Sequence, residues 1–305
     1  MNRLCAISVN LDSAEQYHDI HALPPLDPEV ARGAYDRALR RVLDFGAEHR
    51  IPLTLFVVAR DALHLSSALL LREAVAKGHE IGNHSKDHLR DLVNRSRDEQ
   101  VAQVEGAREL LECALAVTPA GFRAPGYIVT DELLEVVRHT GHRYDSSVLP
   151  SPAFHAARAV AAAALGLRGR RTTPVVAAPN ALRAPRRPYR IGHPYTVHGD
   201  GLVELPVQVT RGPRLPFVGT GLILAGQLGA RALTELVIGE PFINLALHAL
   251  DFLTLDDGLD ALRGYQPDLR LRLAKKRRIL ASVIEHLRAA GYTFVSLERA
   301  AETVV

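Results

Sequence analysis

The sequence has no tryptophan, one methionine and two cysteines, and aromatic residues make up 5% of its 305 residues. The net charge is only +3. A nucleic-acid-binding face usually needs dense basic residues with aromatic partners, so we expect no nucleic-acid partner. Both Cys5 and Cys113 lie in apolar patterns. We therefore expect two buried free thiols and no disulfide, as is usual for a cytoplasmic protein.

Long uninterrupted apolar runs are also lacking. The best candidate for a membrane span, residues 218–239, is interrupted by Gln227, Arg231 and Glu235 and contains five glycines. The first residues pass directly into a strand pattern, without the charged and apolar regions of a secretory signal. We expect no transmembrane segment and a cytoplasmic location.

The residues that are present predict an α/β protein. Hydrophobic residues make up 47% and charged residues 23%, as in globular proteins. Short apolar runs alternate with segments of helical periodicity, which indicates parallel βα units. The strands are expected at residues 4–11, 53–59, 79–82, 121–123, 144–147, 242–248 and 292–297, and the helices at 29–49, 66–77, 96–116, 130–139 and 273–290.

One segment interrupts this alternation. Residues 153–167 form an alanine-rich helical pattern, residues 168–194 are rich in arginine and proline, and residues 202–207 resemble a strand. We interpret residues 1–305 as a single domain, with a specialised insertion at about 150–219 over the mouth of the fold. Candidate site residues fall at the predicted carboxyl ends of strands, where barrels of this class place their chemistry.

A potential metal site stands out among these residues. His84 and His88 are four residues apart and present two imidazoles to one point, and Asp12 follows the first predicted strand. Two neutral imidazoles and one carboxylate form a common open-sided ligand set for zinc, which leaves a position for water. We expect one divalent transition metal, zinc first, with cobalt, nickel or iron as alternatives that fit the same ligands.

Five short signatures occur in a fixed order. They are Asn10-Leu11-Asp12, His84-Ser85-Lys86-Asp87-His88, Arg123-Ala124-Pro125-Gly126, Tyr144-Asp145-Ser146-Ser147 and Leu245-Ala246-Leu247-His248. Because these signatures occur in this order, the chain resembles the polysaccharide deacetylase family (carbohydrate esterase family 4). The resemblance covers residues 1–150 and about 240–300. The resemblance implies a distorted (β/α)7-type barrel and a metal-dependent removal of an N-acetyl group.

The resemblance also implies a role for each signature. Asp12, His84 and His88 would hold the metal, and His248 would be the general acid that protonates the leaving amine. Arg123 would orient the acidic position of the first strand. The backbone N–H of Gly126 would stabilise the oxyanion. Tyr127 and Asp145 are candidate substrate-binding residues, with bracing of the loop or barrel as the alternative.

Asn10 departs from the family pattern, in which an Asp at this position is the general base. An amide cannot accept a proton near neutral pH, and loss of a positioned base typically costs about 10²–10⁴-fold in rate. Three explanations stay open. Asn10 replaces a natural Asp; the base comes from Glu15 or Asp251, or the metal acts without one; or the chain is a catalytically silent ligand-binding relative.

The expected substrate is an N-acetylated sugar or an amphiphilic glycoconjugate. The segment 150–219 combines apolar residues with arginines, which suits a lipid-linked substrate or peripheral membrane contact. A packed lid and a homo-oligomer contact are the alternative interpretation of the same residues. A cyclic-amide hydrolase is a third functional hypothesis, because the same barrel supports such relatives.

Overall fold

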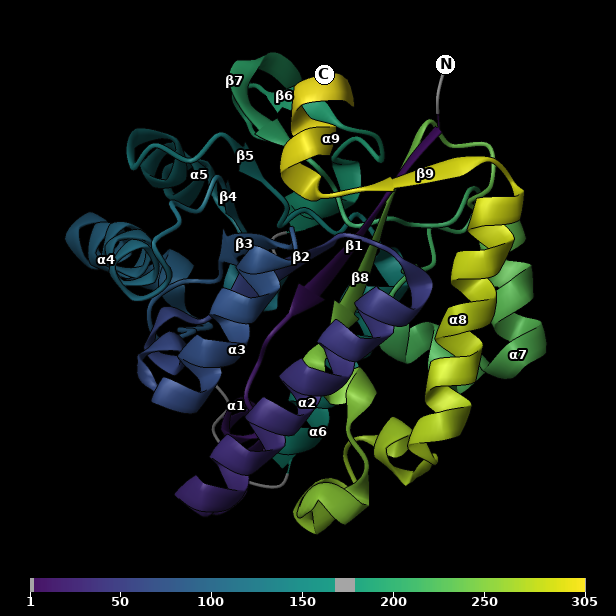
Figure 1. Ribbon diagram of the computed structural model, residues 1–305. Coiled ribbons are helices and arrows are strands. Elements are labelled where there is room, and N and C mark those ends of the chain that lie inside the picture. Colours follow the sequence, from purple (N-terminus) through teal and green to yellow (C-terminus); the bar gives the residue numbers. More distant parts are fainter. Residues whose placement is uncertain (1–2, 168–178, 305) are drawn as a thin grey trace.

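The computed structural model describes residues 3–167 and 179–304, and one curled sheet runs through it (Figure 1). The sheet forms a half-barrel, which confirms the predicted α/β class with a distorted barrel. Its strands are β1 (Arg3–Asn10), β2 (Leu53–Val57), β3 (Glu80–Asn83), β4 (Gly121–Phe122), β5 (Tyr144–Asp145), β6 (Tyr189–Ile191), β7 (His198–Glu204), β8 (Phe242–His248) and β9 (Tyr292–Val295).

The strand order is β6-β7-β5-β4-β3-β2-β1-β8, with β9 also paired to β1. All neighbouring strands are parallel except β6 and β7. The carboxyl ends of β1, β3, β4 and β8 therefore meet at one edge of the sheet. The register of β1 and β8 places Asn10 directly beside His248.

The helices begin where the sequence offers caps. Asp27 accepts hydrogen bonds from the first turn of α2, Ser96 and Glu99 form the predicted capping box of α4, and Thr130 caps α5. The helices are α1 (Ala14–Ile20), α2 (Pro28–His49), α3 (Leu65–Ala76), α4 (Arg97–Leu115), α5 (Asp131–His139), α6 (Pro152–Leu167), α7 (Gly219–Glu235), α8 (Leu273–Ala289) and α9 (Leu297–Val304).

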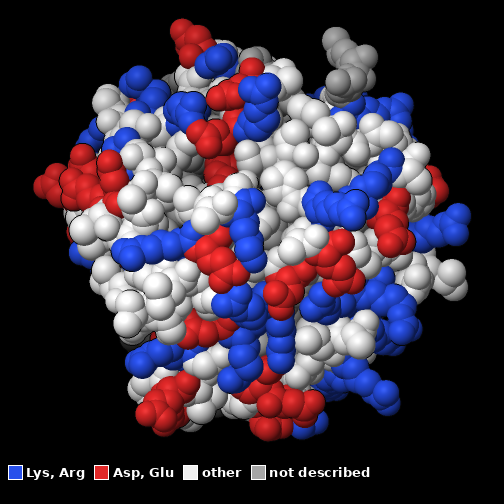
Figure 2. All heavy atoms as spheres, viewed as in Figure 1, with Lys and Arg blue, Asp and Glu red and all other residues white. Residues whose placement is uncertain are grey.

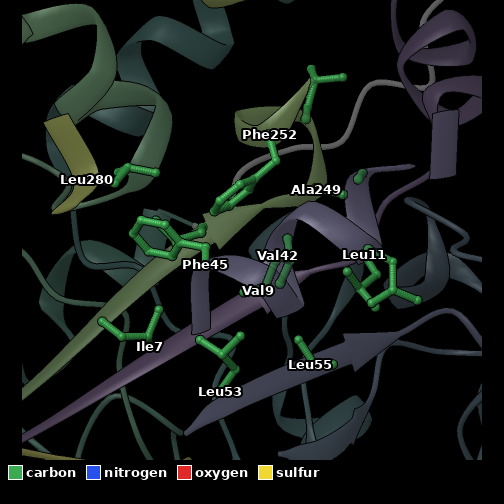
Figure 3. Close-up of a cluster of buried hydrophobic side chains, with 14 of the residues drawn as sticks. Ile7, Val9, Leu11, Val42, Phe45, Leu53, Leu55, Ala249, Phe252 and Leu280 are labelled. Atoms are coloured by element: carbon green, nitrogen blue, oxygen red, sulfur yellow. The ribbon is translucent and has the colours of Figure 1, made fainter. Parts of the chain in front are cut away.

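The main core lies between β1 and the helices that cover it. Ile7, Val9 and Leu11 contribute to one cluster with Val42 and Phe45 of α2 (Figure 3). Successive side chains of a strand point to opposite faces. Ser8 and Asn10 therefore point into the half-barrel, where Ser8 Oγ donates to Asn244 Oδ1 at 2.9 Å. The interior near the site is thus polar, whereas the helix-covered side is apolar.

The segment 150–219 contributes to the sheet itself. After α6, β6 and β7 form an antiparallel pair, and β7 pairs in parallel with β5. The arginine- and proline-rich pattern did not predict β6, because Pro188 and two neighbouring arginines obscure a strand of three residues. The cluster Arg168, Arg170 and Arg171 lies outside the described residues.

The two cysteines differ in their exposure to solvent. Cys5 is buried, but Cys113 is exposed, so the prediction of two buried thiols was wrong for Cys113. Cys113 lies two positions from Leu111 and from Leu115 on α4. A shift of two positions along a helix turns a side chain away from the buried face.

In the described chain, no helix combines the length and apolarity needed to cross a membrane. On the face drawn in Figure 2, acidic and basic side chains are interspersed.

Candidate metal centre

Three potential metal ligands meet at the carboxyl edge of the sheet. Asp12 follows β1, and His84 and His88 follow β3. The Nε2 atoms of His84 and His88 lie 3.1 and 3.4 Å from Asp12 Oδ1. The three ligand atoms lie within 4.8 Å of one another. In a tetrahedral site, bonds of about 2.0–2.2 Å to one ion separate neighbouring ligand atoms by about 3.3–3.6 Å, so the spacing is close to that of a metal centre.

The hydrogen bonds around these atoms also fit a cation. His84 Nδ1 lies 2.7 Å from the carbonyl oxygen of Arg123, which can only accept, so Nδ1 carries the proton and Nε2 has a free lone pair. That lone pair faces Asp12 Oδ1, another acceptor. Both of these atoms, and His88 Nε2, are buried without a hydrogen-bond partner. A cation between them would satisfy all three.

Electrostatics favours the ligand form of these groups. Burial raises the pKa of Asp12, but the neighbouring imidazoles of His88 and His84 outweigh this effect and hold the pKa well below its usual range. Burial lowers the pKa of His84, although Asp12 opposes this. A deprotonated carboxylate and a neutral imidazole are the forms that bind a metal.

The loop that carries both histidines has a strained backbone. Ser85 and His88 adopt left-handed conformations with φ of 66° and 57°. Asn83 holds this loop, because its Oδ1 accepts from Ser85 N at 2.8 Å and its Nδ2 donates to the Val104 carbonyl at 2.8 Å. Gln103 of α4 hydrogen-bonds both the backbone and the side chain of Asp87. Asn83 and Gln103 belong to none of the signatures in the sequence.

Those two residues left only a weak signal in the sequence. Asn83 stands directly before His84 at the end of a strand, and Gln103 occupies a buried position of α4 among apolar residues. A buried polar residue next to a candidate ligand is a sign of a supporting hydrogen bond, but only the tertiary structure identifies its partner.

Asn10 is buried at the centre of a second set of contacts. Arg123 Nη1 donates to Asn10 Oδ1 at 2.8 Å, which leaves the Asn10 Nδ2 group facing the Tyr127 hydroxyl at 3.4 Å. Tyr127 Oη lies 3.4 Å from His248 Nε2. Asn10, Tyr127 and His248 thus come together from three different segments of the chain.

Arg123 is fully buried, yet its guanidinium bonds only neutral groups. It donates to the Ser146 carbonyl and hydroxyl and to Ser8 Oγ, at 2.7–3.0 Å, in addition to Asn10. Its planar face lies 4.1 Å from the centre of the Phe56 ring. Burial lowers its pKa. An aspartate at position 10 would turn the contact with Arg123 into an ion pair.

Asp145 ends β5 and is fully buried. Its two carboxylate oxygens accept hydrogen bonds from Ser147 N at 2.9 Å and from Ser147 Oγ at 2.8 Å. It also bonds Glu204 of β7, which sequence analysis did not single out. Burial and the neighbouring Asp145 charge raise the pKa of Glu204 well above its usual range. The place of Asp145 suits the bracing role more than contact with a substrate.

The proposed acid and oxyanion groups flank the metal ligands. His248 ends β8; its backbone N–H donates to Asp251 Oδ2 at 2.9 Å, and its Nδ1 is buried without a partner. Gly126 and Tyr127 lie in a short 3-10 turn, Pro125–Tyr127, both with positive φ (65° and 60°). Glycine adopts this backbone without steric cost, whereas Tyr127 does so under strain.

The two alternative bases lie in different environments. Asp251 is fully buried, and its oxygens accept from Thr220 Oγ1 at 2.7 Å and from His248 N. Burial raises its pKa. Glu15 lines a cavity of about 210 Å³ together with Asp61 and Tyr35, and none of Asp12, His84 and His88 is among its described lining residues. No hydrogen bond in the described chain joins either carboxylate to Asp12, His84 or His88.

Asp61 is a further titratable group that sequence analysis missed. Its Oδ2 is buried without a partner. Burial raises its pKa to about 7, although Arg60 opposes the rise. It follows β2 on the turn Ala59–Leu63, where an isolated Asp in a short polar segment carries no sequence signal of burial.

Comparisons with known proteins agree with this geometry. Residues 33–144 match the family described as polysaccharide deacetylase. A stretch of 100 residues is 33% identical to a chitooligosaccharide deacetylase from Sinorhizobium fredii. That stretch is 33% of this chain and 46% of the relative, so the match spans about half the length of that protein.

Two solved structures share the fold. One is a Mycobacterium smegmatis protein assigned to the polysaccharide deacetylases, with a TM-score of 0.61 and 21% identity over 100% of this chain and 91% of that one. The other is a CE4 family pseudoenzyme from Bacillus anthracis, with a TM-score of 0.51 and 12% identity over 98% of this chain and 66% of that one. A mutant of that pseudoenzyme has restored enzymatic activity.

Proposed function

We propose that this chain is a member of the polysaccharide deacetylase family. We further propose that it is a metal-dependent hydrolase that removes an N-acetyl group from an amino sugar or a sugar-bearing amphiphile, including a lipid-linked one. The observation that carries the proposal is the convergence of three buried, unpartnered acceptor atoms of Asp12, His84 and His88. The name of the Sinorhizobium fredii relative supports an acetylated carbohydrate as substrate.

Each residue of the site has a part in this reaction. Asp12, His84 and His88 would hold a divalent cation, zinc first, with cobalt, nickel or iron as alternatives. When bound, such a cation polarises the amide carbonyl and lowers the pKa of a water toward neutrality. His248 would carry the proton for the leaving amine, and the Gly126 N–H would donate to the developing oxyanion.

Asn10 limits what this chain can do. Its Oδ1 is held by Arg123 and its Nδ2 faces Tyr127, so no proton acceptor stands where the family base acts. Both oxygens of Asp251 accept hydrogen bonds, and the metal ligands are not among the described lining residues of the cavity that contains Glu15. We therefore propose that the unsubstituted protein, with Asn10, is a slow deacetylase. In this protein the bound cation would activate water without help from a strong protein base.

A silent ligand-binding protein is the second candidate, and the Asn10 amide is the observation that favours it. The fold is shared with a pseudoenzyme, so loss of activity on this architecture has a precedent. A cyclic-amide hydrolase is the third candidate. Its products would be ring-opened ureides instead of acetate.

Metal analysis combined with product analysis tests the proposal. Purified parent and Asp12→Ala proteins are analysed for metal content by mass spectrometry and then assayed for acetate release from N-acetylated oligosaccharides. We expect about one equivalent of a divalent transition metal and slow acetate release, both lost in Asp12→Ala. Metal without product from any acetylated sugar would favour the binding protein, and absence of metal after reconstitution would reject the metal-dependent hydrolase.

A further inference from the structure

The helix α6 contacts the turn that carries the proposed oxyanion donor. Arg158 of α6 donates from Nη1 to the carbonyl oxygen of Gly126 at 2.8 Å. A Cβ atom on Gly126 would lie 3.4 Å from this Nη1 atom and 3.6 Å from Nη2. The guanidinium therefore packs directly against the side of the turn where any other residue would carry its side chain.

Phe154 makes a second contact between the same two elements. Its ring lies edge-on to the ring of Tyr127, with 6.0 Å between the ring centres. Phe154 and Arg158 are four residues apart on α6, and residues with this spacing lie on one face of a helix. One face of α6 thus contacts both Gly126 and Tyr127.

The turn has a backbone that needs support. Gly126 and Tyr127 both have left-handed conformations, and for Tyr127 this conformation is strained. A strained residue keeps its conformation only where the surrounding structure holds it. The start of the turn is held from the sheet, because Ala124 N donates to Ser147 Oγ at 2.7 Å. The contacts from α6 hold the end of the turn.

Arg158 makes its contact in a partly buried place. Burial lowers its pKa to about 10, so the guanidinium stays charged at neutral pH. Arg190 of the same segment, 150–219, also donates from Nη1 to a glycine carbonyl, that of Gly201, but it is exposed and the distance is 3.4 Å. A short hydrogen bond from a charged donor is stronger than a long one in water. The contact of Arg158 is therefore the one suited to fix a backbone.

We infer that Phe154 and Arg158 are positioning residues, which fix the turn so that the Gly126 N–H points at the developing oxyanion. Gly126 has no Cβ to restrict its own rotation, so a bond to its carbonyl is an effective restraint. The segment 150–219 is then part of the catalytic apparatus through α6. This inference rests on the proposed function for the reaction, whereas the fixing of the turn does not depend on it.

Amide hydrogen exchange tests the fixing of the turn without a substrate. Tyr127 N donates to the Ala124 carbonyl at 3.1 Å within the turn, so its exchange rate reports local opening. In Arg158→Ala we expect this N–H to exchange at least about tenfold faster. The Gln100 N–H at the start of α4, bonded to the Ser96 carbonyl, should be unaffected. Unchanged exchange at Tyr127 in both Arg158→Ala and Phe154→Ala would overturn the inference.

Steady-state kinetics tests the link to catalysis. Acetate release from N-acetylated chito-oligosaccharides is measured in Asn10→Asp, where a faster reaction allows kcat and KM to be separated. Adding Arg158→Ala should lower kcat about tenfold and leave KM and metal content unchanged, because a displaced oxyanion donor matters in the transition state. Phe154→Ala should lower kcat less, since a ring contact is weaker than a charge-assisted hydrogen bond.

Two controls separate positioning from general destabilisation. Guanidinium ion, added to Arg158→Ala at a concentration too low to unfold the protein, should restore part of kcat by donating to the Gly126 carbonyl. Arg190→Ala is the matched variant, because it removes an exposed arginine that also donates to a glycine carbonyl. It should keep the parent kcat. An equal fall of kcat in Arg190→Ala and Arg158→Ala would overturn the inference.

The outcomes separate this inference from the proposed function. Faster exchange at Tyr127 in Arg158→Ala, with no acetate from any of the proteins, would support the fixing of the turn and contradict the deacetylase. Acetate release that Arg158→Ala and Phe154→Ala leave unchanged would support the deacetylase and overturn the positioning role.

Discussion

The metal-ligand half of the site and the proton-transfer half differ in completeness. The acceptor atoms of Asp12, His84 and His88 lie close together, and a backbone carbonyl fixes the tautomer of His84. In the other half, Asn10 replaces a carboxylate and His248 Nδ1 has no partner. The contrast teaches that ion binding and proton transfer are separate properties, which one fold can keep or lose independently.

Arg123 makes the difference sharper. It is buried beside Asn10 and donates to an uncharged amide oxygen at 2.8 Å, where a carboxylate would neutralise it. Asp145 and Glu204 act on Arg123 electrostatically, and burial raises the pKa of both carboxyl groups, which disfavours their charged forms. The proton-transfer half thus keeps the cation of an ion pair without its anion.

The largest expected effect comes from removing a ligand in the complete half. In His84→Ala, the remaining Asp12 and His88 cannot close the ligand set, so we expect less than about 0.1 equivalent of metal against about one in the parent. Mass spectrometry after dialysis measures this. His139→Ala is the control, because His139 is an exposed histidine on α5. Full metal retention in His84→Ala would show that the triad is not the binding site.

Repairing the incomplete half should have the next largest effect. Asn10→Asp restores a proton acceptor and an ion pair with Arg123, so we expect acetate release to rise by about 10²-fold or more with metal content unchanged. Asn94→Asp makes the same chemical change at an exposed position. If the parent is already as active as Asn10→Asp, a different residue or the cation alone supplies the base.

The role of His248 is best measured in the repaired protein. In the Asn10→Asp background, His248→Gln removes the general acid but leaves the metal ligands intact. We expect about a 10²-fold loss of acetate release with normal metal content. An amide substrate with an activated leaving group should suffer a smaller loss, because it needs less protonation. Equal activity of both proteins would remove His248 from the mechanism.

The smallest effect concerns the opposite end of the sheet. Glu80 is buried there, bonded to Tyr144 Oη at 2.5 Å and Thr54 Oγ1 at 2.7 Å, and burial raises its pKa to about 7. Because the folded pKa lies above the unfolded value, the protonated carboxyl stabilises the fold below about pH 4.5. That stability is lost as pH rises through about 7.

Glu80→Gln should remove this dependence. Between pH 5 and 8 the parent should lose about 1–3 kcal/mol of unfolding free energy relative to Glu80→Gln. Urea unfolding at both pH values measures the difference. Glu135→Gln, at an exposed ion pair, should show no such change. Metal content should be the same in all three proteins, since Glu80 begins β3 and the histidines follow its other end.

Much of the fold could be predicted because the relevant patterns are local. β8 occupies the predicted residues 242–248, and the helix expected at 29–49 is α2, Pro28–His49. The apolar periodicity, the caps and the glycines after helices act within a few residues. β6 escaped prediction because a three-residue edge strand beside a proline and arginines has too few positions for a pattern to appear.

The sequence by itself determined the kinds of ligand, the strand ends that carry them, and the amide at position 10. Only the tertiary structure decided that the three acceptor atoms of the metal centre are buried without hydrogen-bond partners. It also decided that Arg123 donates to the uncharged Asn10 and that burial raises the pKa of both Asp145 and Glu204. The physical reason is that residue type and periodicity follow from neighbours in the chain. Hydrogen-bond satisfaction and desolvation depend on groups that strand register brings together from distant segments.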